Sequence, residues 1–329
     1  MTALLTINSE RPRLGLALGG GVARGWAHIG VVRALARAGI EPDIICGTSI
    51  GAVVGGCHLA GKLDELEEWA RSLNRLRVMS YMDFRVRQPG LIGGDKLARE
   101  LRNNLGDRTI ESLDRPFVTV AADLSTGHEI WLNKGSIVDA MRASFSLPGI
   151  FSPMLVDNRW LIDGALVNPV PVSVCVAQGA DMVIAVNLNA DIIGRARAPG
   201  NSFPTVAGFD VLDEMENAAP VEPGMLSGLV RRVFRRERDT PSLFGVMASS
   251  LAIVMDRITR SRLAGDPPDV HIGPKLGHIG LMEFDRAEEM IRLGEEATEA
   301  TLPDIMTAME TLNIGHQRRG AVEVPQEAS

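Results

Sequence analysis

Residues 47–51 read Gly-Thr-Ser-Ile-Gly, a G-x-S-x-G pattern centred on Ser49. A short apolar run precedes the serine and a helix-like run follows it, so Ser49 lies where a strand turns into a helix. Gly47 and Gly51 are small enough to allow the sharp turn that exposes a nucleophilic hydroxyl in front of a helix N-terminus. The alternative interpretation is a serine that caps an ordinary helix.

A second glycine-rich turn starts at Gly19, ends at Gly25 and leads into a helix-like segment. Such a turn presents free backbone N–H groups, which bind a pyrophosphate or a developing oxyanion. A dinucleotide site needs G-x-G-x-x-G, but Arg24 stands at the third glycine position, and the next strand ends at Cys46 instead of an acid. We therefore favour an oxyanion hole with Gly20 and Gly21 as donors. Arg24 adds positive charge there or forms a local salt bridge.

A nucleophilic serine needs a base. No histidine has a supporting motif: His28 and His58 fall in predicted helices, while His278 lies in a glycine-rich stretch and stays open. Asp163 ends the predicted strand RWLID and is followed by Gly164. A carboxylate at this position is either aimed into a site or part of an ordinary Asp-Gly turn.

The segments GGGVARG, GTSIG, ASFSLPGIFSP and DGALVNPVPV occur in this order. Together they resemble the patatin-like phospholipase family, in particular bacterial members similar to the catalytic domain of neuropathy target esterase. The resemblance covers residues 13–190 closely and residues 243–312 more loosely. It implies a Ser49–Asp163 dyad without histidine, an oxyanion loop from Gly19 to Gly25, and no metal or cofactor. It also implies a three-layer α/β/α fold with a mostly parallel central sheet.

A Ser-Asp dyad meets a physical difficulty, because an ordinary aspartate has a pKa of about 3.9 and is a weak base for an alcohol. The dyad works if the site excludes water and if the oxyanion is stabilised as the proton moves. The glycine turn and the helix N-terminus would supply that stabilisation.

Two successive strand–turn–helix units predict parallel strands in a layered α/β fold. We expect a catalytic core over residues 13–190, an insertion or surface excursion over 191–241, completion of the same domain over 242–313, and a disordered tail over 314–329. Further strands are predicted at 116–124, 128–132, 159–163, 181–188 and 269–273. Further helices are predicted at 136–145, 243–263 and 284–312.

Residues 225–238, within the expected insertion, read MLSGLVRRVFRRER. One face of a helix there would carry Leu226, Leu229, Val230 and Val233. The other face would carry Arg231, Arg232, Arg235, Arg236 and Arg238. A cationic amphipathic helix of this kind lies in the headgroup plane of anionic lipid. The alternative is a surface helix packed on the domain by its apolar stripe.

The net charge of −7 argues against a general polyanion binder, and a single tyrosine argues against a stacking surface for nucleic acid. Cys46, Cys57 and Cys175 fit no zinc pattern, and we expect small buried side chains in a reducing compartment. The first residues do not resemble a signal peptide, and no apolar run is long enough to span a bilayer. We expect a cytoplasmic enzyme that acts on lipid or small acyl esters, with a peripheral membrane contact as an option. Acyl transfer and a non-catalytic lipid- or anion-binding role stay open, as does the oligomeric state.

Overall fold

The computed structural model describes residues 12–74, 77–78, 95–191 and 243–320. Within them, eight strands form one sheet. They are β1 (Leu14–Leu18), β2 (Ile44–Thr48), β3 (Phe117–Asp123), β4 (Glu129–Leu132), β5 (Met154–Val156), β6 (Arg159–Asp163), β7 (Met182–Val186) and β8 (Val270–Ile272). The strand order is β5-β6-β3-β2-β1-β7-β8, with β4 paired to β3 beside this path.

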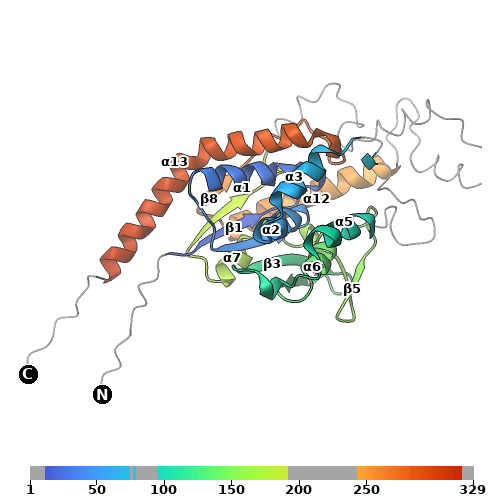
Figure 1. Cartoon of the computed structure of the whole chain (residues 1–329), viewed down its shortest axis with the longest axis horizontal. Helices are drawn as coiled ribbons and strands as arrows, with labels where there is room; N and C mark the ends of the chain where they lie inside the picture. The colour runs from blue at the N-terminus through green and yellow to red at the C-terminus, as the bar shows by residue number, and fades with distance from the viewer. Residues whose placement is uncertain (1–11, 75–76, 79–94, 192–242, 321–329) are drawn as a thin grey trace, which may run out of the picture.

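The strands β3, β2, β1, β7 and β8 are parallel neighbours, whereas β4, β5 and β6 form antiparallel pairs. Helices connect and cover this sheet (Figure 1). They are α1 (Ala27–Arg37), α2 (Ile50–Leu59), α3 (Leu63–Arg71), α5 (Asp95–Leu105), α6 (Ile137–Ser144), α7 (Val172–Ala177), α12 (Leu243–Gly265) and α13 (Ala287–Gly320). The prediction of a mostly parallel central sheet is confirmed.

Helices cover both faces of the sheet. Leu16 and Ile45 point to one face, where they pack against residues of α1, α2 and α13. Ala17 and Cys46, each next along its strand, point to the other face and pack against Cys175 and other residues of α7. Because neighbouring residues of a strand point to opposite faces, the two clusters make a three-layer α/β/α fold.

α1 and α13 lie side by side along one edge of the molecule (Figure 1). A Cβ atom at Gly30 would lie 1.9 Å from the carbonyl oxygen of Ile291, and one at Gly294 would lie 2.0 Å from the carbonyl oxygen of Ala27. Glycine at these two positions lets the two helix backbones approach closely. α13 is thereby packed closely against α1.

Most predicted elements are present within a few residues of their expected bounds. β5 and α7 were not predicted: β5 is very short, and the alternating VSVCV of α7 is more typical of a strand. α13 extends to Gly320, into the expected tail, and it contains Pro303 in its interior. Cys46, Cys57 and Cys175 are buried and form no disulfide, as expected.

Nearly all of the expected insertion, including residues 225–238, lies outside the described residues, as do residues 321–329. Among the helices that the structure describes, none combines the length and the apolar character needed to cross a bilayer.

Candidate active site

Two strands end head to head on one edge of β3. β2 runs parallel to β3, and its last residue, Thr48, is opposite Val120. β6 runs antiparallel to β3, and its last residue, Asp163, is opposite Ala121. β4 occupies the other edge of β3 over the same residues. The C-terminal ends of β2 and β6 therefore meet, and Asp163 lies beside the residue that follows Thr48.

That residue is Ser49, which joins β2 to α2 with a backbone φ of 57° and ψ of −124°. A positive φ in a non-glycine residue costs about 1–3 kcal/mol and is often found at functional sites. A Cβ atom at Gly47 would lie 2.5 Å from the backbone nitrogen of Ala52, and one at Gly51 would lie 2.2 Å from the carbonyl oxygen of Leu18. Only glycine fits on either side of this turn, as the G-x-S-x-G pattern predicts.

The hydroxyl of Ser49 donates a hydrogen bond to Asp163 Oδ2 at 2.6 Å. Asp163 Oδ1 accepts a second hydrogen bond from the N–H of Ala165 at 2.8 Å, which fixes the carboxyl orientation. Ser49 and Asp163 are only 5% and 1% exposed. This burial raises the pKa of Asp163 to about 7, although the hydrogen bonds from Ser49 and Ala165 lower it. The carboxylate is therefore a stronger base than an exposed aspartate.

Hydrogen bonds to α6 and to the segment after β6 hold the turn in place. The N–H of Ser49 donates to Ser144 Oγ at 2.9 Å, and Ser144 Oγ donates to the carbonyl oxygen of Val120 at 2.6 Å. Thr48 Oγ1 donates to the carbonyl oxygen of Asn168 at 2.9 Å. We did not single out Ser144 or Asn168 from the sequence, although both lie in segments that carried the family resemblance.

The glycine turn lies directly against Ser49, since a Cβ atom at Gly20 would be 3.4 Å from Ser49 Cβ. The N–H of Gly19 donates to the carbonyl oxygen of Val186 at 3.1 Å, and that of Gly20 donates to Pro169 at 2.9 Å. The prediction that Gly20 supplies a free N–H is therefore wrong. The reason is that the segment after β6 folds back and offers a carbonyl acceptor, which the sequence of the turn does not show.

The next two N–H groups, of Gly21 and Val22, have no hydrogen-bond partner within the described residues. The carbonyl oxygen of Gly20 accepts from Asn189 Nδ2 at 3.3 Å, and that of Gly21 accepts from the N–H of Arg24 at 3.1 Å. In a trans peptide the carbonyl and the following N–H point in opposite directions. These bonds therefore turn the N–H groups of Gly21 and Val22 away from Asn189 and Arg24.

The side chains of Arg24 and His28 hold the glycine turn in place through hydrogen bonds. The guanidinium of Arg24 is buried and donates to the carbonyl oxygen of Ile279 at 2.9 and 2.6 Å and to Asn189 Oδ1 at 3.3 Å. These acceptors are neutral oxygens, so the contacts are local hydrogen bonds and do not decide between the two interpretations of Arg24. Burial lowers the pKa of His28 to about 4, so the ring is neutral. Its Nε2 lies 2.7 Å from the carbonyl oxygen of Gly19 and donates to it.

Two further glycines of the turn allow close packing. A Cβ atom at Gly21 would lie 2.6 Å from the side chain of Leu188, and one at Gly25 would lie 2.1 Å from that of Ile50. Gly25 therefore lets the turn approach the first residue of α2.

Among the residues that the structure describes, no histidine side chain forms a hydrogen bond or ion pair with Ser49 or Asp163. His278, which the sequence left open, pairs with Glu289 at 2.8 Å. Within the described residues, no three His, Cys, Asp or Glu side chains lie close enough to hold a metal ion. The three-layer fold and a serine hydroxyl bonded to a buried carboxylate define a class of α/β protein suited to serine acyl-transfer chemistry.

Comparison with known proteins identifies relatives of this chain. A family model described as patatin-like phospholipase matches residues 16–176. An NTE family protein of Mycobacterium tuberculosis is 35% identical over 91% of this chain and 94% of that protein. Lysophospholipase nte1 of Emericella nidulans is 27% identical over 85% of this chain but only 17% of that protein. The chain belongs to the NTE family of patatin-like phospholipases, and it is a hydrolase of the phospholipase or esterase type.

Solved structures give weaker likenesses. Human GIVD cytosolic phospholipase A2 is 13% identical, with a TM-score of 0.46 over 93% of this chain and 60% of that chain. VipD from Legionella pneumophila is also 13% identical, with a TM-score of 0.36 over 77% of this chain and 67% of that chain.

Proposed function

We propose that the chain hydrolyses acyl esters of phospholipids or lysophospholipids, with Ser49 as nucleophile and Asp163 as base. The observation that carries this proposal is the 2.6 Å hydrogen bond from Ser49 Oγ to a buried carboxylate at the junction of two strand ends. The family description and the lysophospholipase nte1 among the relatives support a lipid ester as substrate.

In the first half of the reaction, Ser49 Oγ attacks the ester carbonyl carbon as its proton passes to Asp163 Oδ2. The electron pair of the C=O π bond moves to oxygen and makes a tetrahedral oxyanion. Collapse of this intermediate breaks the bond to the alcohol oxygen, which takes the proton from Asp163. In the second half, water attacks the acyl–Ser49 ester and gives its proton to Asp163. Release of the fatty acid returns that proton to Ser49 Oγ.

The oxyanion needs donors that are in place before the reaction starts. We assign this role to the N–H groups of Gly21 and Val22, which no protein group occupies within the described residues. One such donor contributes about 2.7–4 kcal/mol to lowering the barrier. The N-terminus of α2, which begins right after Ser49, adds a favourable dipole.

A fluorophosphonate probe tests the nucleophile, because an activated serine attacks such an electrophile. We expect wild-type protein to be labelled and to cleave p-nitrophenyl esters, and Ser49→Ala to lose both activities. Ser261→Ala, which removes an exposed hydroxyl on α12, is the matched control and should behave as wild type. Undiminished ester turnover in Ser49→Ala would refute the assignment.

We also propose that the arginine-rich residues 225–238 bring the enzyme into peripheral contact with anionic lipid. Their sequence alone supports this proposal, since they lie outside the described residues.

A further inference from the structure

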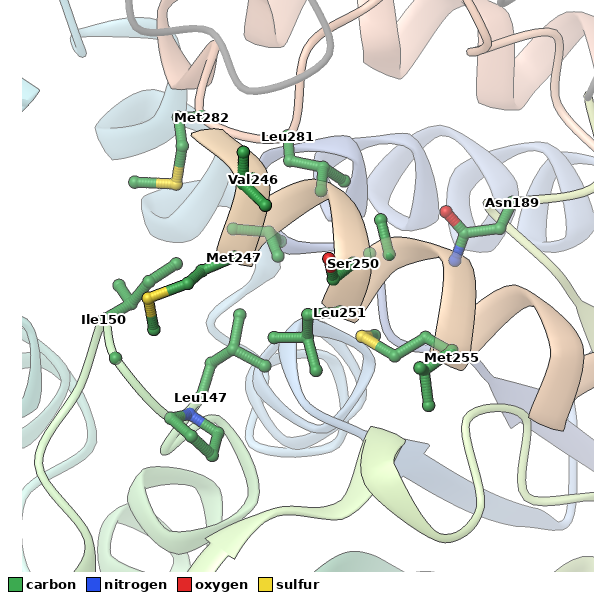
Figure 2. A pocket seen from close by; sticks show the side chains of 16 residues that line it. Leu147, Ile150, Asn189, Val246, Met247, Ser250, Leu251, Met255, Leu281 and Met282 are labelled. Carbon is green, nitrogen blue, oxygen red and sulfur yellow. The ribbon is translucent and has the colours of Figure 1, made fainter. Parts of the chain in front are cut away.

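A cavity of about 400 Å³ lies between α12 and the loop that follows α6 (Figure 2). Leu251 and Met255 line it from α12, and Leu147 and Ile150 line it from the loop. No charged side chain is among its lining residues. Its polar side chains are those of Ser250 and of Asn189, and Asn189 is already bonded to Arg24 and to the carbonyl of Gly20. The chemistry of this cavity therefore suits an apolar ligand.

The cavity begins beside the candidate reaction centre. Gly21 and Val22, which carry the unpaired N–H groups, form part of its wall. Ala165 packs in one cluster with Val22, Leu147 and Met255, and its N–H holds the carboxylate of the dyad. A substrate carbonyl bound to the two N–H groups would therefore have one substituent directed along α12.

We propose that this cavity binds the acyl chain of the ester and that α12 limits the chain length. This inference rests on the proposed function. At about 30 Å³ for each water-sized group, the cavity accommodates about a dozen carbon atoms. α12 lies outside residues 16–176, the part matched by the family model, so this wall of the cavity comes from the C-terminal segment of the chain.

Leu251→Trp tests the inference with p-nitrophenyl butanoate, octanoate and dodecanoate. In the wild type, kcat/KM should rise with chain length, by up to about fourfold for each methylene that is transferred from water into the cavity. An indole at position 251 fills the space next to Leu147. We expect the ratio of kcat/KM for dodecanoate to that for butanoate to fall at least tenfold.

Ile253→Trp is the matched control, because it places the same side chain on the same helix at an exposed position that does not line the cavity. Its chain-length profile should equal that of the wild type. If Leu251→Trp does not fold, Ala252→Leu adds a smaller group to the same wall and should shift the optimum to shorter chains.

Failure of the acyl-site proposal can be distinguished from failure of the proposed function. A chain-length profile that Leu251→Trp or Ala252→Leu leaves unchanged overturns the acyl site, while Ser49-dependent turnover of butanoate leaves the proposed function intact. Turnover that persists in Ser49→Ala overturns the proposed function itself.

Discussion

The carboxyl group of Asp163 is buried from water and accepts hydrogen bonds from Ser49 and Ala165. Its pKa of about 7 gives a direct kinetic expectation, because only the ionised carboxylate accepts the proton of Ser49. The kcat/KM for a neutral ester should rise with pH up to about 7 and level off above it. Asp163→Asn keeps the shape of the side chain and should lower kcat at least about 10²-fold.

The same burial predicts how stability depends on pH. An aspartate in the unfolded chain titrates near 3.9, so between about pH 4 and about pH 7 the folded state binds a proton that the unfolded chain releases. Stability from this group falls as the pH rises through that window, and the loss is complete above it. The Tm of Asp163→Asn should therefore rise by several degrees relative to wild type between about pH 5 and about pH 8. A Tm difference that is the same at both pH values would contradict a raised pKa.

At the same scale, the residues around Ser49 indicated a nucleophile turn, whereas Asp163 as its partner followed only from the family resemblance. Of the two N–H groups that we assign as donors, the sequence indicated Gly21 but not Val22. Which N–H groups of the turn stay free depends on carbonyl oxygens from Pro169 and Val186, far away in the sequence. The N–H of Val22 has no partner among the residues that the structure describes, and the residue type does not predict this, because the fold sets the backbone φ of 53° at Val22.

At the scale of elements, all strands except β5 were predicted, but the register between them was not. The register of β2 and β6 on β3 creates the dyad, because a shift of one residue in either strand would move Thr48 or Asp163 to the opposite face. The alternation of residue types within one strand does not show how that strand aligns with its neighbours. The sequence also did not predict that α12 lines a cavity, because it indicated only an apolar helix there.

Residues 225–238 give a prediction for an element that lies outside the described residues. Each basic residue near an anionic surface contributes about 1 kcal/mol, so five arginines outweigh the repulsion from a chain of net charge −7. The full chain should co-sediment with vesicles that contain anionic lipid, and less so as salt is added. Replacing the five arginines by glutamine should abolish sedimentation without changing hydrolysis of soluble esters. Equal sedimentation of the two proteins would indicate that the segment packs on the domain instead.

At the scale of the whole molecule, α13 from the C-terminal part of the described chain packs against α1 from its N-terminal part. Ile291 and Gly294 of α13 face Gly30 and Ala27 of α1 at backbone distance, and Arg37 of α1 pairs with Glu295 at 3.0 Å. The glycine turn and Ser49 lie at the ends of strands that these helices cover. We infer that residues 242–313 complete the domain of the catalytic core, as we proposed from the sequence, and that the two parts unfold together.

Gly294→Ala tests whether the packing of α13 on α1 stabilises the whole domain. In a helix, alanine is normally more stable than glycine by about 1 kcal/mol, so an unobstructed substitution would stabilise the protein. At position 294 the added methyl would lie 2.0 Å from the carbonyl oxygen of Ala27, and a backbone atom cannot move aside as a flexible side chain does. Overpacking at such a site costs about 1–3 kcal/mol, so we expect a lower Tm in a single thermal transition followed by circular dichroism. Gly265→Ala is the matched control, because nothing lies within 4 Å of a Cβ atom there and its Tm should equal that of wild type or exceed it. Two separate transitions in Gly294→Ala, with Ser49-dependent activity surviving the first, would mean that α13 is not part of the catalytic unit.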